Sequence, residues 1–445
     1  MRVAGPDGRL DIAVVGSGIA GLSAAWLLSQ GHRVTLYESA ARPGGHSNTV
    51  EAPGSAGPIP VDTGFIVYNQ STYPNLTALF RHLDVATKPS DMSFAVSLDR
   101  GALEYAGTNL FGLFAQPVNL LRPRFWSMLR DLQRFYREAP ADPETASASL
   151  GQYLEARGYG AAFQEDHLLP MAAAIWSASA SDVRDYPAAS FVRFCDNHGL
   201  LKIRDRPVWR TVVGGSQAYV RRLAAAIGPG LLLKRAVTAV RRVPDGVRIQ
   251  DSSGAQAHFD HVVIATHGDQ ALRLLEDPDD RESRLLGAFR YAQNLAVLHS
   301  DPTVMPRRRR VWSSWNYVGQ RDEPDRLTVT YWMNRLQGLA DDTPLFVTLN
   351  PDRMPQRAIH SEMYEHPQFD AAAMRAQTDL WSLQGRRRTW FCGAWFGAGF
   401  HEDGLQAGLA VAEQLGGLRR PWQVPNENGR IHVTPVPVAA TERVG

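Results

Sequence analysis

Three glycines near the start of the chain have the spacing of a loop that holds a dinucleotide. Gly16, Gly18 and Gly21 follow an apolar run. In such a loop the first glycine permits a tight turn, the second lets the backbone approach a pyrophosphate, and the third lets the next helix pack against the strand. The start of that helix, at Ile19 and Ala20, offers free N–H groups and a positive dipole end to the phosphates.

An acid and a second glycine turn extend this pattern. Glu38 ends a second apolar strand, at the expected distance of about 20 residues from the first turn. Its carboxylate can accept hydrogen bonds from ribose hydroxyls, and an acid at this position argues against a 2′-phosphate on that ribose. Gly44 and Gly45 form the second turn. Together these elements predict a nucleotide-binding domain of the Rossmann type.

The bulk composition allows two or three domains and excludes several kinds of partner. The 445 residues carry a net charge of only +2, so we expect no nucleic-acid partner. Cys195 and Cys392 have no spacing typical of a metal site or a disulfide framework, and we expect free thiols and no metal. No secretory signal or apolar stretch of about 18 residues is visible. We expect a cytoplasmic protein, with contact to the inner face of a membrane as an option.

The predicted elements alternate between two domains of an α/β (α+β) protein. We assign the discontinuous nucleotide-binding domain to residues 1–72, 206–282 and 386–418. We assign a substrate domain, with a mixed sheet and a helical cap, to residues 73–205 and 283–385. The Pro-rich segment 419–445 lacks periodicity, so we expect a loosely ordered tail.

Periodicity and turn residues predict the elements within these domains. Residues 73–205 are expected to be mainly helical, with apolar residues at helical spacing over 76–83, 125–136 and 153–171. Strands are expected over 231–242, 261–266, 294–299, 311–318, 327–333, 345–349 and 389–393. A last helix is expected over 404–415.

The split domain favours FAD over NAD. An NAD dehydrogenase normally completes its binding domain in one continuous block, whereas here the pieces are far apart in the sequence. Neither Gly228-Pro229-Gly230 nor Thr266-His267-Gly268 has the strand-turn-helix context of a second dinucleotide site. We therefore expect a flavin that takes its electrons from the substrate and passes them to oxygen, a quinone or another carrier.

A family resemblance supports this interpretation. The motifs that carry it are Glu38 with Gly44-Gly45, then Val61-Asp62-Thr63-Gly64, Gly214-Gly215-Ser216, Phe391-Cys392-Gly393 and Gly404-Leu405-Gln406-Ala407-Gly408. In this order they resemble the flavin amine oxidase and phytoene desaturase superfamily, which implies an amine-oxidase-like fold.

A narrower resemblance involves four further motifs. These are Gly44-Gly45-His46-Ser47-Asn48-Thr49, Trp315-Asn316-Tyr317, Tyr331-Trp332-Met333-Asn334 and Gly399-Phe400-His401-Glu402-Asp403-Gly404. They look like a bacterial group known only as predicted NAD/FAD-binding proteins. Members of that group often accompany enzymes that methylate or cyclopropanate membrane acyl chains.

The resemblance implies an FAD site with contributions from distant segments. The implied ligands are Gly16, Gly18, Ile19, Ala20, Gly21, Glu38, Ser39, Arg42, Gly44, Gly45, His46, Thr63, Gly64, Phe65, Val237, Thr266, Gly393, Asp403, Gly404 and Leu405. Among them, Arg42 to His46 would line the diphosphate and flavin side, and Thr63-Gly64 would lie close to the ring. Val237 would hold the adenine through its backbone. The residues from Gly393 onward would lie at the ribityl chain and the pyrimidine edge.

The sequence departs from the amine oxidases in two places. Those enzymes commonly hold a lysine near flavin N5 through a water molecule, but here no lysine follows Lys234. Phe400 stands where many of them have one tyrosine of the aromatic pair that encloses the amine. Both departures weigh against amine oxidation.

Aromatic and polar residues on two predicted strands are the candidates for the substrate side. Alternation along a strand allows Trp315 with Tyr317, or Tyr331 with Met333, to line one cavity. Asn334 follows the second strand. The alternative is ordinary core packing, because aromatic residues are favoured in strands.

Histidines and one further aromatic residue complete the candidate catalytic set. His46, Phe400 and His401 lie in the motifs that contact the flavin, and an imidazole can act as a general base. The spacing does not identify which one acts. We interpret His198 and His299 as core or loop histidines.

Residues 109–137 interleave large apolar side chains with arginines. This pattern suits a helical face that rests on anionic lipid headgroups. The alternative is a cap helix packed on the substrate domain.

Three functional hypotheses remain. The leading one is an FAD-dependent oxidoreductase that moves hydride from an aliphatic C–H to flavin N5, and so desaturates or oxidises a hydrophobic substrate such as a phospholipid acyl chain. The second is an amine oxidase. The third is a flavoprotein without catalytic activity that serves as a partner module.

Overall fold

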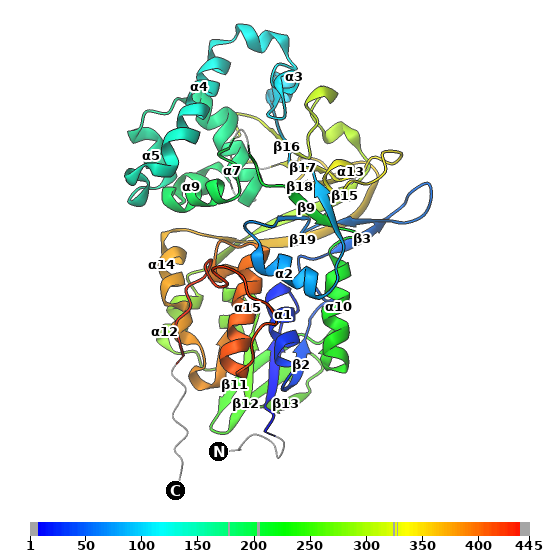
Figure 1. Cartoon of the computed structure of the whole chain (residues 1–445), viewed down its shortest axis with the longest axis vertical. Coiled ribbons are helices and arrows are strands. Elements are labelled where there is room, and N and C mark those ends of the chain that lie inside the picture. The colour runs from blue at the N-terminus through cyan, green and yellow to red at the C-terminus, as the bar shows by residue number, and fades with distance from the viewer. Residues whose placement is uncertain (1–7, 177–178, 203–204, 324, 327, 437–445) are drawn as a thin grey trace.

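The structure is a computed structural model that describes residues 8–176, 179–202, 205–323, 325–326 and 328–436. Figure 1 shows two bodies stacked along the long axis, with the first and last described residues at the lower one. The lower body contains a parallel sheet, and the upper body contains a mixed sheet with helices beside it. This mixed α/β architecture confirms the predicted fold class.

A five-stranded parallel sheet forms the centre of the lower body. Its strand order is β10 (Leu231–Leu232), β2 (Arg33–Tyr37), β1 (Asp11–Val15), β14 (His261–Ile264) and β20 (Thr389–Phe391). Every residue of β1 after the first is buried, as expected for a strand with both faces covered. The strands come from three distant parts of the chain, so the sheet is discontinuous in sequence.

Helices and a smaller sheet surround these strands. They are α1 (Ile19–Leu28), α10 (Gln217–Ile227), α11 (Gly268–Leu274), α12 (Asp280–Leu286), α14 (Ala371–Asp379), α15 (His401–Gly416), and the antiparallel strands β11 (Val237–Val243), β12 (Gly246–Asp251) and β13 (Gln256–Phe259). All ten residues of α1 are buried. The apolar core here also includes Leu76 and Leu79 from α2 (Pro74–His82) and Trp381, which follows α14. On sequence these residues were assigned to the substrate domain, whereas in the structure they belong to the apolar core that includes the parallel sheet.

A seven-stranded sheet spans the upper body. Its strand order is β19 (Ala358–Gln368), β15 (Arg290–His299), β18 (Phe346–Leu349), β17 (Val329–Trp332), β16 (Trp315–Gly319), β7 (Phe94–Leu98) and β8 (Leu103–Ala106). All pairs are antiparallel except β16 with β7. The smaller strands are β3 (Thr49–Ala52), β4 (Ile59–Asp62), β5 (Val67–Asn69), β6 (Thr87–Ser90) and β9 (Trp209–Val212), and a short helix α13 (Met333–Leu336) follows β17.

The cap at the top of Figure 1 is helical, as predicted, and has its own core. Its helices are α3 (Leu110–Leu113), α4 (Pro123–Glu138), α5 (Leu150–Ala156), α6 (Ala161–Phe163), α7 (Leu169–Trp176), α8 (Ala180–Asp185) and α9 (Ala188–Asn197). Phe135, Phe163 and Phe191 are fully buried between them. Ser149 and Gln152 form a capping box that fixes the start of α5.

Several predicted element boundaries are wrong. The expected strand over 231–242 is two strands in different sheets, separated at Lys234, which has a φ of 55°. The expected strand over 311–318 begins only at Trp315, because Trp312 lies in a turn where its indole nitrogen donates to the Pro306 carbonyl. The long strand β19 was not predicted, and the segment 73–205 contains β6, β7 and β8 as well as helices.

The prediction of a loosely ordered tail is wrong for residues 419–436. The Arg420 side chain is fully buried and donates to Glu413 at 2.8 Å and to Asn75 at 2.9 Å. Trp422 stacks on Trp26 with their ring centroids 5.8 Å apart. The segment lacks periodicity because single side chains anchor it, and such anchors leave no repeating pattern. Residues 437–445 lie outside the described part.

Among the described residues, no helix is both long enough and apolar enough to cross a bilayer. The same residues contain no group of three or more His, Cys, Asp or Glu side chains placed to hold a metal ion.

Candidate functional site

The first glycine turn has a geometry that only glycine allows. Gly16 has a φ of 96°, a conformation that side chains disfavour. A Cβ on Gly21 would lie 1.8 Å from the Gly16 carbonyl oxygen, so α1 can approach β1 only with glycine there. At Gly18 no described atom lies within 4 Å of where a Cβ would be. The turn is therefore closed on its inner side and open at Gly18.

The open side of this turn suits a phosphate. Within the described part of the chain, no side chain caps the start of α1 at Gly18. The first amides of a helix lack intrahelical partners, so those of Ile19 and Ala20 can donate to a ligand. This is the cradle that a pyrophosphate would fill.

Glu38 links the end of β2 to the glycine turn. One carboxylate oxygen, Oε2, accepts from the backbone N of Ser17 at 2.9 Å and also from the Ser17 hydroxyl. The other, Oε1, accepts from Ala40 N at 2.7 Å and from the Ser39 hydroxyl at 3.2 Å. Two carboxylate oxygens have about four lone-pair positions in total, and these four donors occupy them in the structure. A ribose hydroxyl would take the place of the Ser17 or Ser39 hydroxyl, because either of these can rotate away. The acid thus lies beside the cradle, where the sequence predicted a ribose ligand.

The second glycine turn lies directly against the first. Gly44 N donates to the Ser17 carbonyl at 2.9 Å, and a Cβ on Gly45 would lie 3.2 Å from Gly18 Cα. Arg42 Nη1 donates to the Gly45 carbonyl at 2.9 Å and thereby braces this turn. Two motifs more than 25 residues apart therefore form one surface.

The predicted flavin side continues from this surface. A Cβ on Gly64 would lie 2.3 Å from the His46 carbonyl oxygen, which also accepts from Phe65 N at 2.7 Å. Thr63 N donates to the Asn48 carbonyl at 2.9 Å. Segments 46–48 and 63–65 are thus held side by side by backbone contacts.

The closing motif adds the N-terminus of α15. A Cβ on Gly404 would lie 2.9 Å from the Ile19 side chain, so the starts of α15 and α1 converge. Asp403 is fully buried, and its Oδ2 accepts from Phe400 N at 2.7 Å and thus caps α15. Its Oδ1 accepts from Arg430 Nε at 2.5 Å. Because both oxygens have protein partners, Asp403 positions the helix start beside the cradle.

The other predicted cofactor residues are spread around this centre. Val237 opens β11 and is half-buried. Thr266 follows β14 next to Gly16, and its carbonyl accepts from Trp395 Nε1 at 3.0 Å. Gly393 follows β20, and Leu405 is fully buried in α15.

A cluster of histidines lies where the two bodies meet. Burial is the largest cause that lowers the pKa of His46 well below its usual value, followed by the nearby His366, His267 and His401. Burial likewise lowers the pKa of His401 to about 3 and that of His366 to about 4. His267 Nδ1 lies 3.1 Å from Glu365 Oε2. At neutral pH we therefore expect His46, His366 and His401 to be uncharged.

His401 is held by three neighbours. Its ring stacks on Phe65 with centroids 3.8 Å apart. Its Nε2 lies 2.6 Å from the Tyr219 hydroxyl and 3.4 Å from the Ser47 hydroxyl. The structure thus brings His401 beside Phe65, another residue of the predicted flavin surface.

Strand β19 supplies residues that sequence reasoning missed. The Tyr364 hydroxyl lies 2.7 Å from Thr63 Oγ1 and accepts from Asn48 Nδ2 at 3.1 Å, and its ring lies 4.9 Å from that of His46. Glu365 and His366 follow it. The one available signal was the alternation along the strand, which its charged residues obscured.

The candidate residues on the aromatic strands, Trp315, Tyr317 and Tyr331, pack together in one apolar core. Trp315 pairs with Tyr331 across β16 and β17, with ring centroids 4.8 Å apart at 88°. In the described part of the chain Trp315 Nε1 is buried without a hydrogen-bond partner. Tyr317 packs in the core of the seven-stranded sheet.

Two expectations about the second strand are wrong. Met333 belongs to α13, so it does not continue the face of Tyr331. Asn334 donates to the carbonyls of Ala340 and Thr343 at 2.5 and 2.8 Å, and it accepts from Leu345 N at 2.7 Å. Its amide holds a turn, so the structure gives Asn334 a structural role.

Phe400 reaches from α15 toward the cap. Its ring stacks on Phe194 with centroids 4.6 Å apart, and it lies 5.9 Å from His198 and 6.5 Å from Trp176. We call Trp176, Phe194, His198 and Phe400 the aromatic wall. It joins the closing motif to α7 and α9.

His198 is more than a satisfied core histidine. Its Nδ1 lies 2.8 Å from the Phe194 carbonyl, so Nδ1 carries the proton and donates it. Its Nε2 is buried and has no hydrogen-bond partner in the described part of the chain. Burial lowers the pKa of His198 to about 3, so this ring offers an unpaired acceptor at neutral pH.

His299, in contrast, bonds to Thr348 Oγ1 at 2.8 Å and to Asp301 N at 3.1 Å, as expected for a core histidine.

The three lysines lie on the surface or in turns. Lys202 and Lys234 are exposed, and Lys88 Nζ donates to the Gly338 carbonyl at 3.0 Å. The two cysteines, Cys195 and Cys392, are free and buried.

Comparisons with known proteins place the chain in a family. The sequence profile described as "Flavin containing amine oxidoreductase" matches residues 19–314. A Mycobacterium tuberculosis protein, AofH, named as a candidate flavin-containing monoamine oxidase, is 31% identical over 366 residues, which cover 78% of this chain and 72% of that protein.

Two solved structures share the fold. A wild-type putrescine oxidase bound to putrescine aligns with a TM-score of 0.63 and 16% identity over 92% of this chain and 99% of that one. A fatty acid isomerase from P. acnes that produces CLA aligns with a TM-score of 0.63 and 17% identity, over 91% of this chain and 97% of that one.

These matches identify the cofactor and show that the protein is an enzyme, but they do not identify its substrate. An enzyme family that contains flavin, together with a dinucleotide cradle in the structure, makes FAD the cofactor and sets aside a flavoprotein without catalytic activity. The chain belongs to the flavin-containing amine oxidoreductase family and is an FAD-dependent oxidoreductase.

Proposed function

We propose that this enzyme takes hydride from an aliphatic C–H of a hydrophobic substrate, and that acyl lipids are the substrate class. Bound FAD supplies the two-electron acceptor at N5. The observation that supports the proposal is the aromatic wall, in which Phe400 contacts Phe194, Trp176 and a neutral His198. Packed rings exclude water and offer apolar surface to a hydrocarbon, and a neutral His198 supplies no charge to pair with an ionic group.

Residues of both glycine turns hold the cofactor in this proposal. The uncapped start of α1 binds the pyrophosphate, and Glu38 binds the adenosine ribose. Thr63, Gly64 and His46 lie on the flavin side. Since their backbones are fixed to one another, these residues would hold the flavin ring in one orientation toward the substrate.

His198 completes the chemistry. In a desaturation one C–H bond breaks with its electron pair as hydride, and the neighbouring carbon loses a proton as the double bond forms. The departing hydride makes that neighbouring C–H strongly acidic, so even a weak base suffices. The unpaired Nε2 of His198 is the acceptor that the wall offers for the proton. Oxygen or a quinone then takes the two electrons.

The lysines support a substrate other than an amine. Amine oxidases of this superfamily commonly place a lysine near flavin N5. Here Lys202 and Lys234 are exposed, and Lys88 bonds to the backbone of Gly338. None of the three lysines belongs to the aromatic wall, which we propose as the substrate side of the flavin.

Anaerobic titration of the FAD-loaded enzyme tests the proposal. Dispersed phospholipids are expected to bleach the oxidised flavin band, and mass spectrometry is expected to find an acyl product lighter by two hydrogens. Unchanged absorbance with lipids, together with rapid bleaching by amines, would overturn it.

An amine oxidase is the second candidate. The observation in its favour is the 31% identity to a protein named as a candidate monoamine oxidase. This function predicts bleaching by putrescine or benzylamine and, in air, release of ammonia with hydrogen peroxide.

A further inference from the structure

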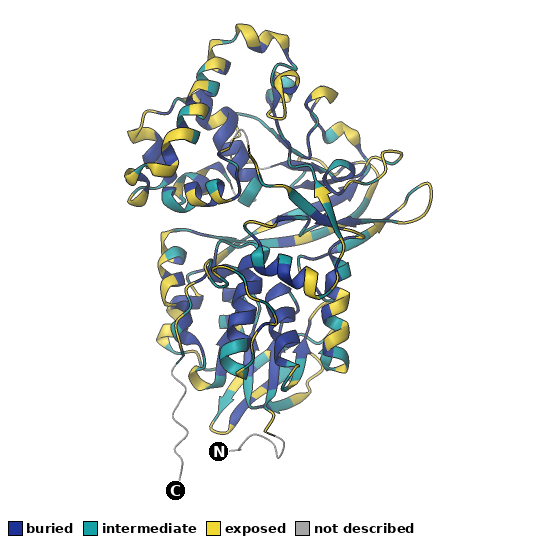
Figure 2. Cartoon of the chain, in the orientation of Figure 1, coloured by how far each residue is buried: buried dark blue, intermediate teal, exposed yellow. Residues whose placement is uncertain are grey.

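Large apolar side chains are exposed at the end of the cap that lies farthest from the chain termini. Six of the eleven exposed large apolar side chains among the described residues fall within 17 consecutive positions, so they form a patch rather than scattered exposures. We call them the apolar tip: Leu110, Phe111, Val118, Leu120, Leu121 and Trp126. Phe111 is 88% exposed and Leu121 is 83% exposed. Figure 2 shows exposed residues along this end of the molecule, at α3 and α4.

Hydrogen bonds beneath the tip hold it in this shape. Asn109 Oδ1 caps α3 by accepting from Gly112 N at 2.8 Å. The Trp126 indole nitrogen donates to the Leu120 carbonyl at 2.9 Å, so the polar atom of this exposed ring is satisfied. The Phe114 ring packs against Trp126 with centroids 5.8 Å apart. The apolar side chains therefore project from an ordered base.

The surroundings of the tip are cationic. Residues 109–137 contain five arginines and one acid, Asp131. The side chains of Arg130 and Arg137 are 77% and 74% exposed, although Arg130 lies 3.6 Å from Asp131 and Arg137 pairs with Glu138 at 2.7 Å. Since residues 109–138 contain five arginines and only these two acids, the segment keeps a net positive charge. An apolar tip with an arginine rim is complementary to an anionic bilayer.

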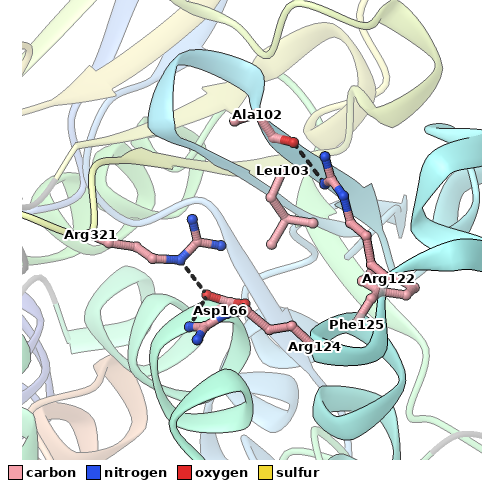
Figure 3. A pocket seen from close by; sticks show the side chains of 7 residues that line it. All are labelled: Ala102, Leu103, Arg122, Arg124, Phe125, Asp166 and Arg321. Atoms are coloured by element: carbon pink, nitrogen blue, oxygen red, sulfur yellow. Dashed lines mark hydrogen bonds and ion pairs between the residues drawn. The ribbon is translucent and has the colours of Figure 1, made fainter.

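A cavity of about 380 Å³ lies just behind the tip (Figure 3). Arg124 and Arg321 converge there on the buried Asp166, with Nε to carboxylate distances of 2.8 Å. Arg122 differs from both. It follows Leu121 in the chain, it donates to the Ala102 carbonyl at 2.8 Å, and among the described residues no carboxylate pairs with it. Its unbalanced charge faces a cavity whose floor includes the apolar Phe125.

We propose that the apolar tip inserts into the interfacial layer of a bilayer rich in anionic phospholipids. Phe111 and Leu121 enter between the acyl chains, while Arg130 and Arg137 contact headgroup phosphates at the rim. Arg122 takes the phosphate of one lipid at the cavity. This docking is independent of the chemistry proposed above, because binding can be measured without turnover.

Flotation with vesicles tests the proposal on the full-length, FAD-loaded enzyme. We expect it to float with vesicles of phosphatidylcholine and phosphatidylglycerol, to float much less with phosphatidylcholine alone, and to be released by high salt. F111S/L121S is expected to weaken binding at least tenfold. R130Q/R137Q and R122Q are each expected to weaken binding severalfold and to reduce its salt dependence.

The matched control is V208S/M354S. Val208 and Met354 are also apolar and lie outside the tip, and they are 65% and 56% exposed. The control is expected to bind like the wild type, and melting temperatures check that each variant is folded. If wild-type enzyme does not float with anionic vesicles, or if F111S/L121S floats as well as V208S/M354S, the proposal is overturned. It is also overturned if the wild type does not float but is a dimer that F111S/L121S converts to a monomer, because the tip would then be an interface between two copies.

Discussion

Arg430 Nε donates to Asp403 Oδ1 at 2.5 Å and so fastens the C-terminal segment to the first turn of α15. Arg430 Nη1 also donates to the Thr72 carbonyl at 3.0 Å, and the guanidinium lies over the Tyr73 ring. Asp403 uses its other oxygen to cap α15 through Phe400 N. The segment after α15 therefore supports both the cofactor side and the aromatic wall.

Replacing Arg430 by methionine should destabilise the protein. The change leaves the fully buried Asp403 carboxylate without its cation, and loss of one partner from such a pair costs about 3–5 kcal/mol. Urea unfolding of the FAD-free protein measures the loss, and fluorescence of released FAD reports whether the start of α15 has loosened. R419M is the control, because Arg419 is 61% exposed and its pairs should contribute about 0–1 kcal/mol. Equal stability of the two variants would contradict the role of Arg430.

The glycine cradle predicts opposite outcomes for two alanine substitutions. G18A should fold normally, because no described atom lies within 4 Å of the new Cβ and the backbone is in a region open to alanine. It should still weaken FAD binding at least tenfold, about 1.4 kcal/mol, because the methyl group occupies the phosphate side. G21A should not fold stably, since its Cβ would lie 1.8 Å from a carbonyl oxygen.

Calorimetric FAD titration and circular dichroism separate these outcomes. G107A is the control, because a Cβ on Gly107 also meets no described atom within 4 Å but lies far from the turn in sequence. Unchanged FAD affinity in G18A would argue against the predicted phosphate position.

His198 can be tested with a matched pair of amides. H198N keeps a donor for the Phe194 carbonyl and removes the outer acceptor, whereas H198Q keeps an acceptor at the outer position. We expect H198N to lower kcat/KM about 10²-fold, with H198Q less affected and FAD content unchanged in both. Because burial lowers the pKa of His198 to about 3, its titration should leave no step in the pH profile between pH 5 and 8. Wild-type kinetics in H198N would rule out a direct role.

Asp62 should make stability depend on pH. Burial raises its pKa to about 6, although hydrogen bonds from Thr49 and Ser216 oppose the shift. A carboxyl whose pKa is raised in the folded state stabilises that state when protonated. Its contribution is fully present below pH 3.8 and is lost as pH rises through 6.

The measurement is the slope of unfolding free energy against pH. Between pH 4 and 6 the Asp62 contribution should fall by up to about 1.4 kcal/mol per pH unit. D62N removes this titration, so its unfolding free energy should change more positively with rising pH than that of the wild type, whatever its absolute stability. Identical slopes would show that Asp62 does not titrate in this range.

Much of the cofactor site could be predicted from the sequence because its motifs act locally. A turn that brings a helix onto a strand requires glycine at fixed positions, and Gly16 and Gly21 show that requirement in the structure. The order of such motifs along the chain indicated FAD and the family, and both are confirmed.

The substrate side could be predicted less well because its contacts are not local. Strand β19 carries Tyr364 and His366 to the predicted flavin surface, but its charged residues hid it in the sequence. Asn334 had the right chemistry for a site and turned out to hold a turn. Composition cannot reveal which partner a polar side chain meets.

The sequence by itself thus determined the cradle, the cofactor and the family, since turn geometry depends on neighbouring residues. Only the tertiary structure decided that the C-terminal segment anchors α15, that His198 keeps an unpaired nitrogen in the aromatic wall, and that the apolar residues near Phe111 remain exposed. Each of these depends on packing between segments far apart in the chain, and local residue patterns do not specify that packing.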